Sequence, residues 1–305
     1  MNRRQMLFSV LAGLAAPMAL LCGATAWPAV LLGLSAAALG IQLTSGCTGL
    51  PRRLRGVYLL WAVLLMGKTA NLSQTCFQDG SGVIPVVLLA LAAAASRKPE
   101  NCGRLGALLC PAVVALIAGM LTFAVVDFKW TRFSVSRDNG VEWMPITAMA
   151  LSPLVLRFRD VEERSLRQGV LSACVFGMIV SVVCSGVLGS LQAVLRQPLY
   201  DMVRGVSVLG VAERLEAMVS VALCIGFFLT LCILCTTSVE LVCETGKKKG
   251  EEWWLAVSAL AVSRPVALLP SYMWFGFSCI LGVVVPILAN KKTNEKNREI
   301  SKNNA

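Results

Sequence analysis

The chain has 305 residues, of which 56% are hydrophobic and only 15% are charged. Soluble domains carry about a quarter charged residues, so this composition argues against an ordinary soluble protein and favours an integral membrane protein made of helices. The net charge of +11 does not indicate a nucleic-acid partner, because most Lys and Arg flank apolar runs, as in the positive-inside pattern of membrane proteins.

The apolar runs predict helices rather than a transmembrane barrel. Barrel strands read as alternating segments of about ten residues, whereas residues 83–96 form one continuous apolar run, VIPVVLLALAAAAS. At the start of the chain, two Arg, an apolar core and an A-x-A-like end resemble a signal peptide. A second apolar run follows at once at 27–43, so we favour a helical hairpin that stays in the membrane.

Ten segments qualify as membrane-spanning helices, because each holds an apolar run near the length of about 20 residues that a bilayer requires. Several are short and would need tilting or local thinning of the bilayer. The predicted spans are residues 6–22, 27–43, 57–72, 83–96, 105–126, 143–156, 169–189, 215–242, 253–270 and 271–289.

The basic residues orient these spans. With the N-terminus inside, most of the 28 Lys and Arg fall on the cytoplasmic side, in groups such as those at 52–55 and 247–249. We therefore expect a multi-pass protein of the cell membrane, in contact with membrane lipids and with both termini cytoplasmic. One transmembrane domain would cover residues 1–289, and the polar tail at 290–305 is expected to be disordered.

The sequence gives no sign of an enzyme or of a bound cofactor. It contains no Walker motif, kinase signature or nucleophile elbow. It has twelve Cys but no His, and most of the Cys lie within apolar runs, where the thiol acts as a small hydrophobe. We therefore expect no catalytic residue, no metal site and no cofactor.

Helix-breaking residues indicate where a ligand would bind. A broken transmembrane helix exposes backbone donors and acceptors, and paired breaks in two halves of a chain mark transporter sites. Ten spans divide into five and five, so the first should match the sixth; the first holds Gly13 and Pro17, and the sixth holds Pro145 and Pro153. Simple kinks are the alternative. The candidate ligand-binding residues around these breaks are Gly13, Ala15, Ala16, Met149 and Ser152.

Two basic residues fall inside predicted spans. Lys68, near the outer end of the third span, either has a buried partner or task, or extends its four methylenes to the interface. Arg264, beside Pro265 in the ninth span, has the same two interpretations, one functional and one lipid-facing. Hydroxyls such as Thr236 and Thr237 in the eighth span are expected to bond carbonyls of their own helix.

The stretch at 197–218 gathers five charges between two apolar runs. Apolar residues at helical spacing, opposite Asp201 and Arg204, predict a short amphipathic helix at the interface or dipping into the protein. Glu213 and Arg214 would then open the long eighth span, where an acidic residue favours a helix start. The functional alternative is an external lid held or released by the charges of Asp201, Arg204, Glu213 and Arg214.

This stretch also carries a family resemblance. Residues 198–216, PLYDMVRGVSVLGVAERLE, resemble the corresponding part of spore-germination permeases of the GerAB type, a family of the amino acid–polyamine–organocation superfamily. Weaker likenesses occur in NRRQMLFSVL at 2–11, at 85–111, and in VVDFKWTRF at 125–133. The resemblance implies a five-plus-five inverted repeat with discontinuous first and sixth helices, and a re-entrant outer lid at 198–214.

The implied role is to detect an amino-acid-like germinant, or to transport an amino acid, together with other germinant-receptor subunits. The chain is short for this family, and the carboxylate that the family tends to carry near the sixth helix is not clearly present. Two alternatives therefore stay open. One is an assembly subunit that has no ligand of its own, and the other is an ion-coupled transporter unrelated to germination.

Overall fold

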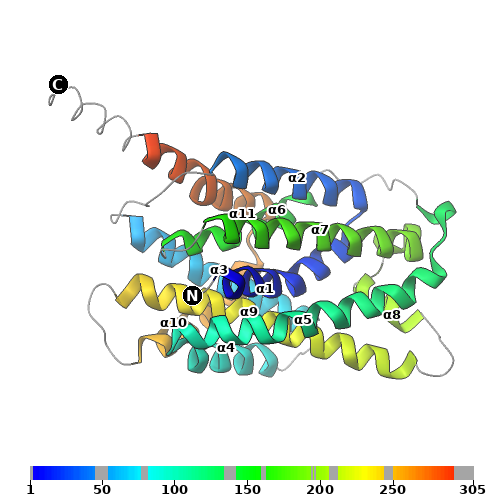
Figure 1. Cartoon of the computed structure of the whole chain (residues 1–305), viewed down its shortest axis with the longest axis horizontal. Coiled ribbons are helices and arrows are strands. Elements are labelled where there is room, and N and C mark those ends of the chain that lie inside the picture. Colours follow the sequence, from blue (N-terminus) through cyan, green and yellow to red (C-terminus); the bar gives the residue numbers. More distant parts are fainter. Residues whose placement is uncertain are drawn as a thin grey trace.

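The structure, a computed structural model, describes residues 3–44, 54–76, 82–133, 142–158, 163–193, 195, 197–205, 212–243 and 250–291. Within these ranges every regular element is a helix, and the helices lie side by side along the long axis of the molecule (Figure 1). The α-helices are α1 (Arg3–Ala24), α2 (Trp27–Leu43), α3 (Arg55–Cys76), α4 (Val83–Ser96), α5 (Pro99–Ala124), α6 (Trp143–Leu151), α7 (Glu163–Leu188), α8 (Pro198–Gly205), α9 (Ala212–Cys243), α10 (Glu251–Ala267) and α11 (Ser271–Cys279). Shorter elements are the 3-10 helices η2 (Val125–Asp127), η3 (Trp130–Arg132), η4 (Ser152–Phe158) and η5 (Gly189–Ala193), and the π-helix η6 (Ile280–Val284).

Each predicted span coincides with one of these helices, alone or with its short continuation. Among the described residues, five helical runs are long and apolar enough to cross a membrane, namely Arg4–Ala24, Glu100–Asp127, Glu163–Gln192, Ala217–Val242 and Ser271–Lys291. Shorter apolar runs accompany them at Trp27–Leu43, Val83–Ser96 and Trp143–Leu156. Helices α3 and α10, which carry Lys68 and Arg264, belong to neither group. This all-helical architecture is typical of an integral membrane protein.

The end of the chain is described only in part. After η6 the last helix continues to Lys291, close to the boundary expected between the transmembrane domain and the polar tail. Residues 292–305, which make up nearly all of that tail, lie outside the described residues.

Helix α1 occupies the centre of the bundle. It packs against α7, α5 and α9, and it contributes small buried residues such as Ala12 and Ala19. Small side chains let neighbouring backbones approach closely in membrane bundles. Helix α2 packs mainly against α6 and α7. Both helices are therefore part of the bundle, but the expected hairpin is wrong in one respect: in the described residues α1 and α2 do not pack closely on each other, because each finds its main partners elsewhere.

An aromatic cluster marks one end of the bundle, the end that also carries α8 and that we call the α8 end (Figure 1). Trp27 stacks on Phe133 with ring centroids 5.1 Å apart, and Phe128 and Trp130 pack beside Phe133. Aromatic belts of this kind are enriched where membrane proteins meet the headgroup region. Arg132 donates a 2.8 Å hydrogen bond to the carbonyl of Val187, which fastens this segment to the end of α7.

The short amphipathic helix predicted near residue 200 is present as α8. Its apolar residues Leu199, Met202 and Val203 are buried, and it packs against α1, α5, α7 and α9. The hydroxyl of Tyr200 lies 2.9 Å from that of Ser220, so a hydrogen bond joins α8 to α9. Helix α8 thus dips into the protein rather than lying on its surface.

A π-helical turn interrupts the last helix and is held by a neighbour. Such turns leave a carbonyl without its usual partner and are frequent at functional sites. Here the buried hydroxyl of Tyr58 on α3 donates to the carbonyl of Leu281, at 2.5 Å. The bond fixes the first turn of α3 against the middle of the last helix.

Candidate functional site

Helix α1 runs without a break through Gly13 and Pro17, so the predicted discontinuity of the first helix is wrong. Proline lacks an N–H group, and inside a helix it leaves the carbonyl four residues earlier without a donor. For Pro17 that carbonyl belongs to Gly13. The hydroxyl of Thr230 on α9 lies within hydrogen-bond distance of this carbonyl and of the Gly226 carbonyl in its own helix, so its single proton is shared between the two acceptors. A donor from the neighbouring helix replaces the missing bond, and α1 stays α-helical.

The corresponding position in α6 has a different outcome. Pro153 leaves the carbonyl of Met149 without its usual donor. The backbone N–H of Ser152 donates to this carbonyl instead, in the three-residue pattern of a 3-10 helix. The chain then continues as the 3-10 helix η4 instead of unwinding. Pro145 causes no break, because it lies in the first turn of α6, where backbone N–H groups have no helical partner. The sixth span therefore changes its helical type at Ser152.

A cavity lies where α1, η4 and α9 meet, and we call it the Gly13 cavity. It comprises about 330 Å³ including its opening. Its polar groups are hydroxyls, of which Thr230 and Thr237 already donate to backbone carbonyls. The enclosed part holds water-sized molecules only, so a larger ligand requires the helices to part. The lining residues are Val10, Gly13, Leu14, Ser152, Pro153, Val155, Leu156, Thr230, Ile233, Leu234 and Thr237.

The bond from Thr230 to α1 yields a prediction about stability. Replacing Thr230 with Val keeps the shape of the side chain but leaves the buried carbonyl of Gly13 without a donor, which costs about 1–3 kcal/mol. Thr230→Ser retains the hydroxyl and is the matched control. We expect the melting temperature of the purified protein in detergent to fall clearly for Thr230→Val and much less for Thr230→Ser. Equal melting temperatures for the two variants would show that the bond does not support α1.

A second cavity, the Lys68 cavity, opens between α3, α6 and α11 beside the end of α1. It comprises about 440 Å³ including its opening. The ammonium of Lys68 lies over the ring of Trp274, 5.9 Å from the centroid. The indole N–H of Trp274 donates to the carbonyl of Val266 at 3.4 Å, which fixes the ring. The lining residues are Leu21, Leu65, Lys68, Leu72, Pro145, Ala148, Met149, Ser271 and Trp274.

Burying the charged side chain of Lys68 in a membrane protein costs free energy. Insertion scales give about 2.5–3.5 kcal/mol for a basic residue at the centre of a transmembrane helix, which is an upper bound for Lys68 near the outer end of its predicted span. A cation–π contact returns about 0.5–2 kcal/mol. Among the described residues no carboxylate lies within 4 Å of the Lys68 ammonium, and the ring of Trp274 is its partner. The half-buried charge is therefore only partly compensated.

The two cavities share two helices. Helix α1 contributes Leu14 to one and Leu21 to the other, and the α6–η4 segment contributes Ser152 and Met149. The hydroxyl of Ser152 lies 3.8 Å from the sulfur of Met149, a weak hydrogen bond between the two linings. Two residues of one helical turn thus line different cavities.

The structure distributes the predicted ligand-binding residues unevenly. Gly13 and Ser152 line the Gly13 cavity, and Met149 lines the Lys68 cavity. Ala15 and Ala16 are fully buried in helix packing and line neither cavity.

The predicted charged residues are more scattered. Lys68 faces its cavity, whereas Arg264 is exposed in the last turn of α10, where a cation complements the helix dipole. Asp201 lies half-buried in the first turn of α8. The backbone of Arg204 is in α8 and that of Glu213 and Arg214 in the first turn of α9, but their side chains lie outside the described part of the structure. No described residue of α8 lines either cavity.

Sequence reasoning missed two residues of the site. Thr230 is one of several hydroxyl residues of α9; Thr236 and Thr237 bond carbonyls of their own helix as predicted, and Thr230 does so too while reaching α1. No local signal separates it from the others. Trp274 follows Pro270 closely and is far in sequence from Lys68, so only the fold brings the two together.

The chain matches no known protein-family model and no curated protein. Any assignment of function therefore rests on the geometry above and on the sequence resemblance at 198–216.

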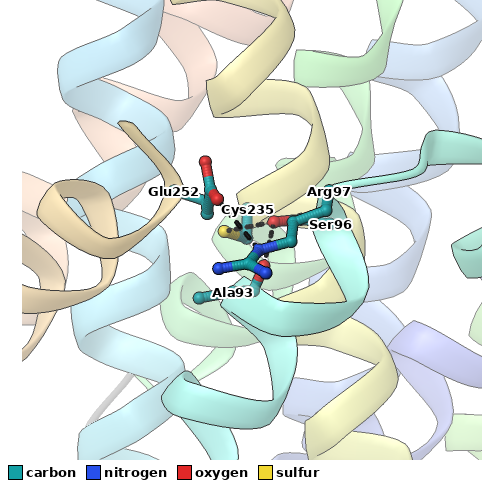
Figure 2. Close-up of polar contacts among 5 residues, drawn as sticks. All are labelled: Ala93, Ser96, Arg97, Cys235 and Glu252. Carbon is teal, nitrogen blue, oxygen red and sulfur yellow. Dashed lines mark hydrogen bonds and ion pairs between the residues drawn. The ribbon is translucent and has the colours of Figure 1, made fainter. Parts of the chain in front are cut away.

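A polar cluster at the opposite end of the bundle is structural in character (Figure 2). The guanidinium of Arg97, at the end of α4, pairs with Glu252 of α10 at 3.1 Å, and the thiol of Cys235 on α9 lies 3.4 Å from the Ser96 hydroxyl. Ser96 also donates to the carbonyl of Ala93. Because 59% of the Arg97 side chain is exposed, the ion pair is worth at most about 1 kcal/mol. The cluster fastens α4 to α9 and α10.

Proposed function

We propose that this protein is a membrane permease or germinant sensor that binds a small amino-acid-like molecule between α1 and the α6–η4 segment. Its fold in this proposal is a five-plus-five inverted repeat, in which α1 to α5 correspond to α6, α7, α9, α10 and α11. Ten spans place both termini in the cytoplasm. The observation that carries the proposal concerns the two cavities: the helices that line the Gly13 cavity have, as their equivalents in the other half of the repeat, helices that line the Lys68 cavity.

Helix packing supports this correspondence. The contact between α1 and α7 has its counterpart in that between α6 and α2, and the contact of α1 with α5 has its counterpart in that of α6 with α11. In the same way, α3 packs on α10 as α9 packs on α4, and α3 packs on α4 as α9 packs on α10. Inverted repeats of this kind bind substrate where the two halves meet.

The cavities follow the same exchange. The Gly13 cavity is lined by α1, η4 and α9. The equivalents of these three elements in the other half of the proposed repeat are α6, α1 and α3, and all three line the Lys68 cavity. The halves differ in one respect. Helices α1 and α5 pack firmly on α9, whereas in the described residues α6 and α11 do not pack comparably on α3. Alternating access in such folds moves one half against the other around a fixed site. Here the weaker helix packing is that of α6 and α11 on α3, which surrounds the Lys68 cavity.

The distribution of basic residues indicates which end of the bundle faces the cytoplasm. The α8 end carries the aromatic cluster and few basic residues, and the opposite end carries the basic groups of the positive-inside pattern. In Figure 1 the end of α1 marked N and the red end of the last helix both lie toward the left, opposite α8. The Lys68 cavity then faces the outside of the cell. The resemblance at 198–216 to spore-germination permeases supports the same class of protein.

The continuous α1 changes how a ligand would be held. An unbroken helix offers no free N–H groups at Gly13, so the polar contacts in the Gly13 cavity come from the hydroxyls of Ser152, Thr230 and Thr237. These groups suit the ammonium or hydroxyl end of a small molecule, and the remaining lining is apolar. A ligand would have to part α6 from its neighbours to enter.

A binding panel tests the proposal. Purified protein in detergent is incubated with each of the twenty radiolabelled amino acids, and retained label is measured. We expect one or a few, with short apolar side chains, to bind at micromolar to millimolar concentration, roughly the range of many transported or sensed metabolites. Uptake into proteoliposomes under an imposed ion gradient separates a permease from a sensor. Folded protein that binds none of the twenty contradicts the proposal.

The unbroken α1 favours one alternative, an assembly subunit without a ligand. In that case the bundle would serve to hold partner subunits, and filling either cavity would leave assembly intact. Co-purification of partner subunits by wild-type protein and by Gly13→Leu, combined with an empty binding panel, identifies this alternative.

A further inference from the structure

We propose that the Lys68 cavity is a carboxylate-binding site, in which the ammonium of Lys68 pairs with the anionic end of a small ligand that has an apolar body. The inference rests on the proposed function, because it takes this cavity as the outer entrance to the ligand path. It adds the chemical class of the ligand and names the residue that selects it.

The first argument is charge. Among the described residues, Lys68 is the one charged residue that lines either of the two cavities, and no carboxylate of that part of the chain lies within 4 Å of its ammonium. The side chain is half-buried, lies over the ring of Trp274 and lines the cavity. Ionisable residues in transmembrane helices commonly mark functional sites, and the described surroundings of Lys68 supply no counterion for its charge.

The second argument is the position of Trp274. Its ring is 5% exposed, and its N–H is already bonded to Val266, so the indole presents only its face to the cavity. The ring therefore positions the ammonium without neutralising it. An entering carboxylate would complete a charge-assisted bond, which is stronger than a neutral hydrogen bond. Ser271, the first residue of α11, places a hydroxyl on the same lining.

The rest of the lining defines the body of the ligand. Leu65, Leu72, Pro145, Ala148 and Met149 offer apolar surface, and none of the described residues that line the cavity is acidic and able to receive a second cation. The site thus fits a monocarboxylate with a short branched aliphatic body. It disfavours dicarboxylates, since one ammonium cannot compensate two charges, and it disfavours ligands whose net charge is positive.

The experiment compares an acid with its neutral amide. Binding of 4-methylpentanoate and of 4-methylpentanamide to the purified protein is measured by isothermal titration calorimetry. We expect the wild type to prefer the acid by roughly tenfold or more. Lys68→Met keeps the length and apolar stem of the side chain, and it should reduce this preference to about twofold or less. Lys68→Arg retains the charge and should keep the preference. Arg264→Met, which removes an exposed cation elsewhere, is the matched control and should behave as wild type.

Each outcome decides the matter. A wild type that binds both compounds equally or binds neither, or a folded Lys68→Met that keeps the preference for the acid, overturns the inference. The amino-acid panel is separate. Amino-acid binding that is unaffected by Lys68→Met leaves the proposed function standing without this site, and Lys68-dependent binding of 4-methylpentanoate with an empty panel leaves the site standing without the proposed function.

Discussion

Gly226→Ala is expected to destabilise the protein by about 1–3 kcal/mol, the usual cost of forcing extra volume into a packed interior. The Cβ of the new alanine would collide with the Cβ of Ala16 on α1, and it would lie 3.3 Å from the backbone nitrogen of Ala16. Neither atom can rotate away, because both are fixed to the α1 backbone. Helices α1 and α9 would have to separate, and the bond from Thr230 to Gly13, one turn along, would lengthen with them. Thermal unfolding in detergent measures the effect.

Two further variants make this result specific. Ala16→Gly removes the atom that Gly226→Ala would strike, so the double variant should recover part of the lost stability, less about 1 kcal/mol for a second helical glycine. Gly119→Ala is the matched control, because a Cβ at Gly119 on α5 meets no atom within 4 Å. It should be neutral or slightly stabilising. Equal losses for Gly226→Ala and Gly119→Ala would contradict a close approach of α1 to α9.

Gly13→Leu is expected to weaken ligand binding by roughly tenfold or more, the loss expected when a binding cavity is filled. A Cβ at Gly13 would lie 2.8 Å from Cδ1 of Ile233, the far end of a flexible side chain that can turn aside. The protein should therefore fold, with a modest fall in melting temperature. The isobutyl group would then occupy the Gly13 cavity. Binding of the amino acid selected by the panel, measured with radiolabel, gives the result.

The control for this variant is Gly119→Leu, which adds the same side chain to a helix surface with open space. It should bind as the wild type does. A Gly13→Leu protein that folds and keeps full affinity would place the ligand elsewhere and would leave the Gly13 cavity as a packing defect.

The helical architecture could be read from the sequence with little loss. Continuous apolar runs such as 83–96 leave no choice but helices in a bilayer, because every backbone polar group must be satisfied within its own segment. The short helix α8 was equally accessible, since Leu199, Met202 and Val203 recur at helical spacing. The count of ten spans and the inverted repeat stay predictions, supported by the basic residues and by the packing of α1 to α11.

The candidate site was accessible only in part. Gly13 and Ser152 were found because glycine and proline disturb helices, and both line a cavity. Ala15 and Ala16 are next to Gly13 in the sequence, but both are fully buried in helix packing; Ala16 lies one turn from Gly13 on the same face, where the close approach of Gly226 on α9 leaves no cavity. The contact between Lys68 and Trp274 joins α3 to α11, and nothing in the local sequence around either residue predicts it.

The two prolines show most clearly what the sequence determined and what only the tertiary structure decided. The sequence alone establishes that Pro17 and Pro153 each deprive a carbonyl four residues earlier of its donor. It does not say what replaces that donor. In α1 the hydroxyl of Thr230 arrives from α9 and the helix continues, whereas at Pro153 the N–H of Ser152 closes a tighter turn and the helix becomes η4. The loss of a bond is a local property of the chain, but its compensation depends on which helix packs alongside.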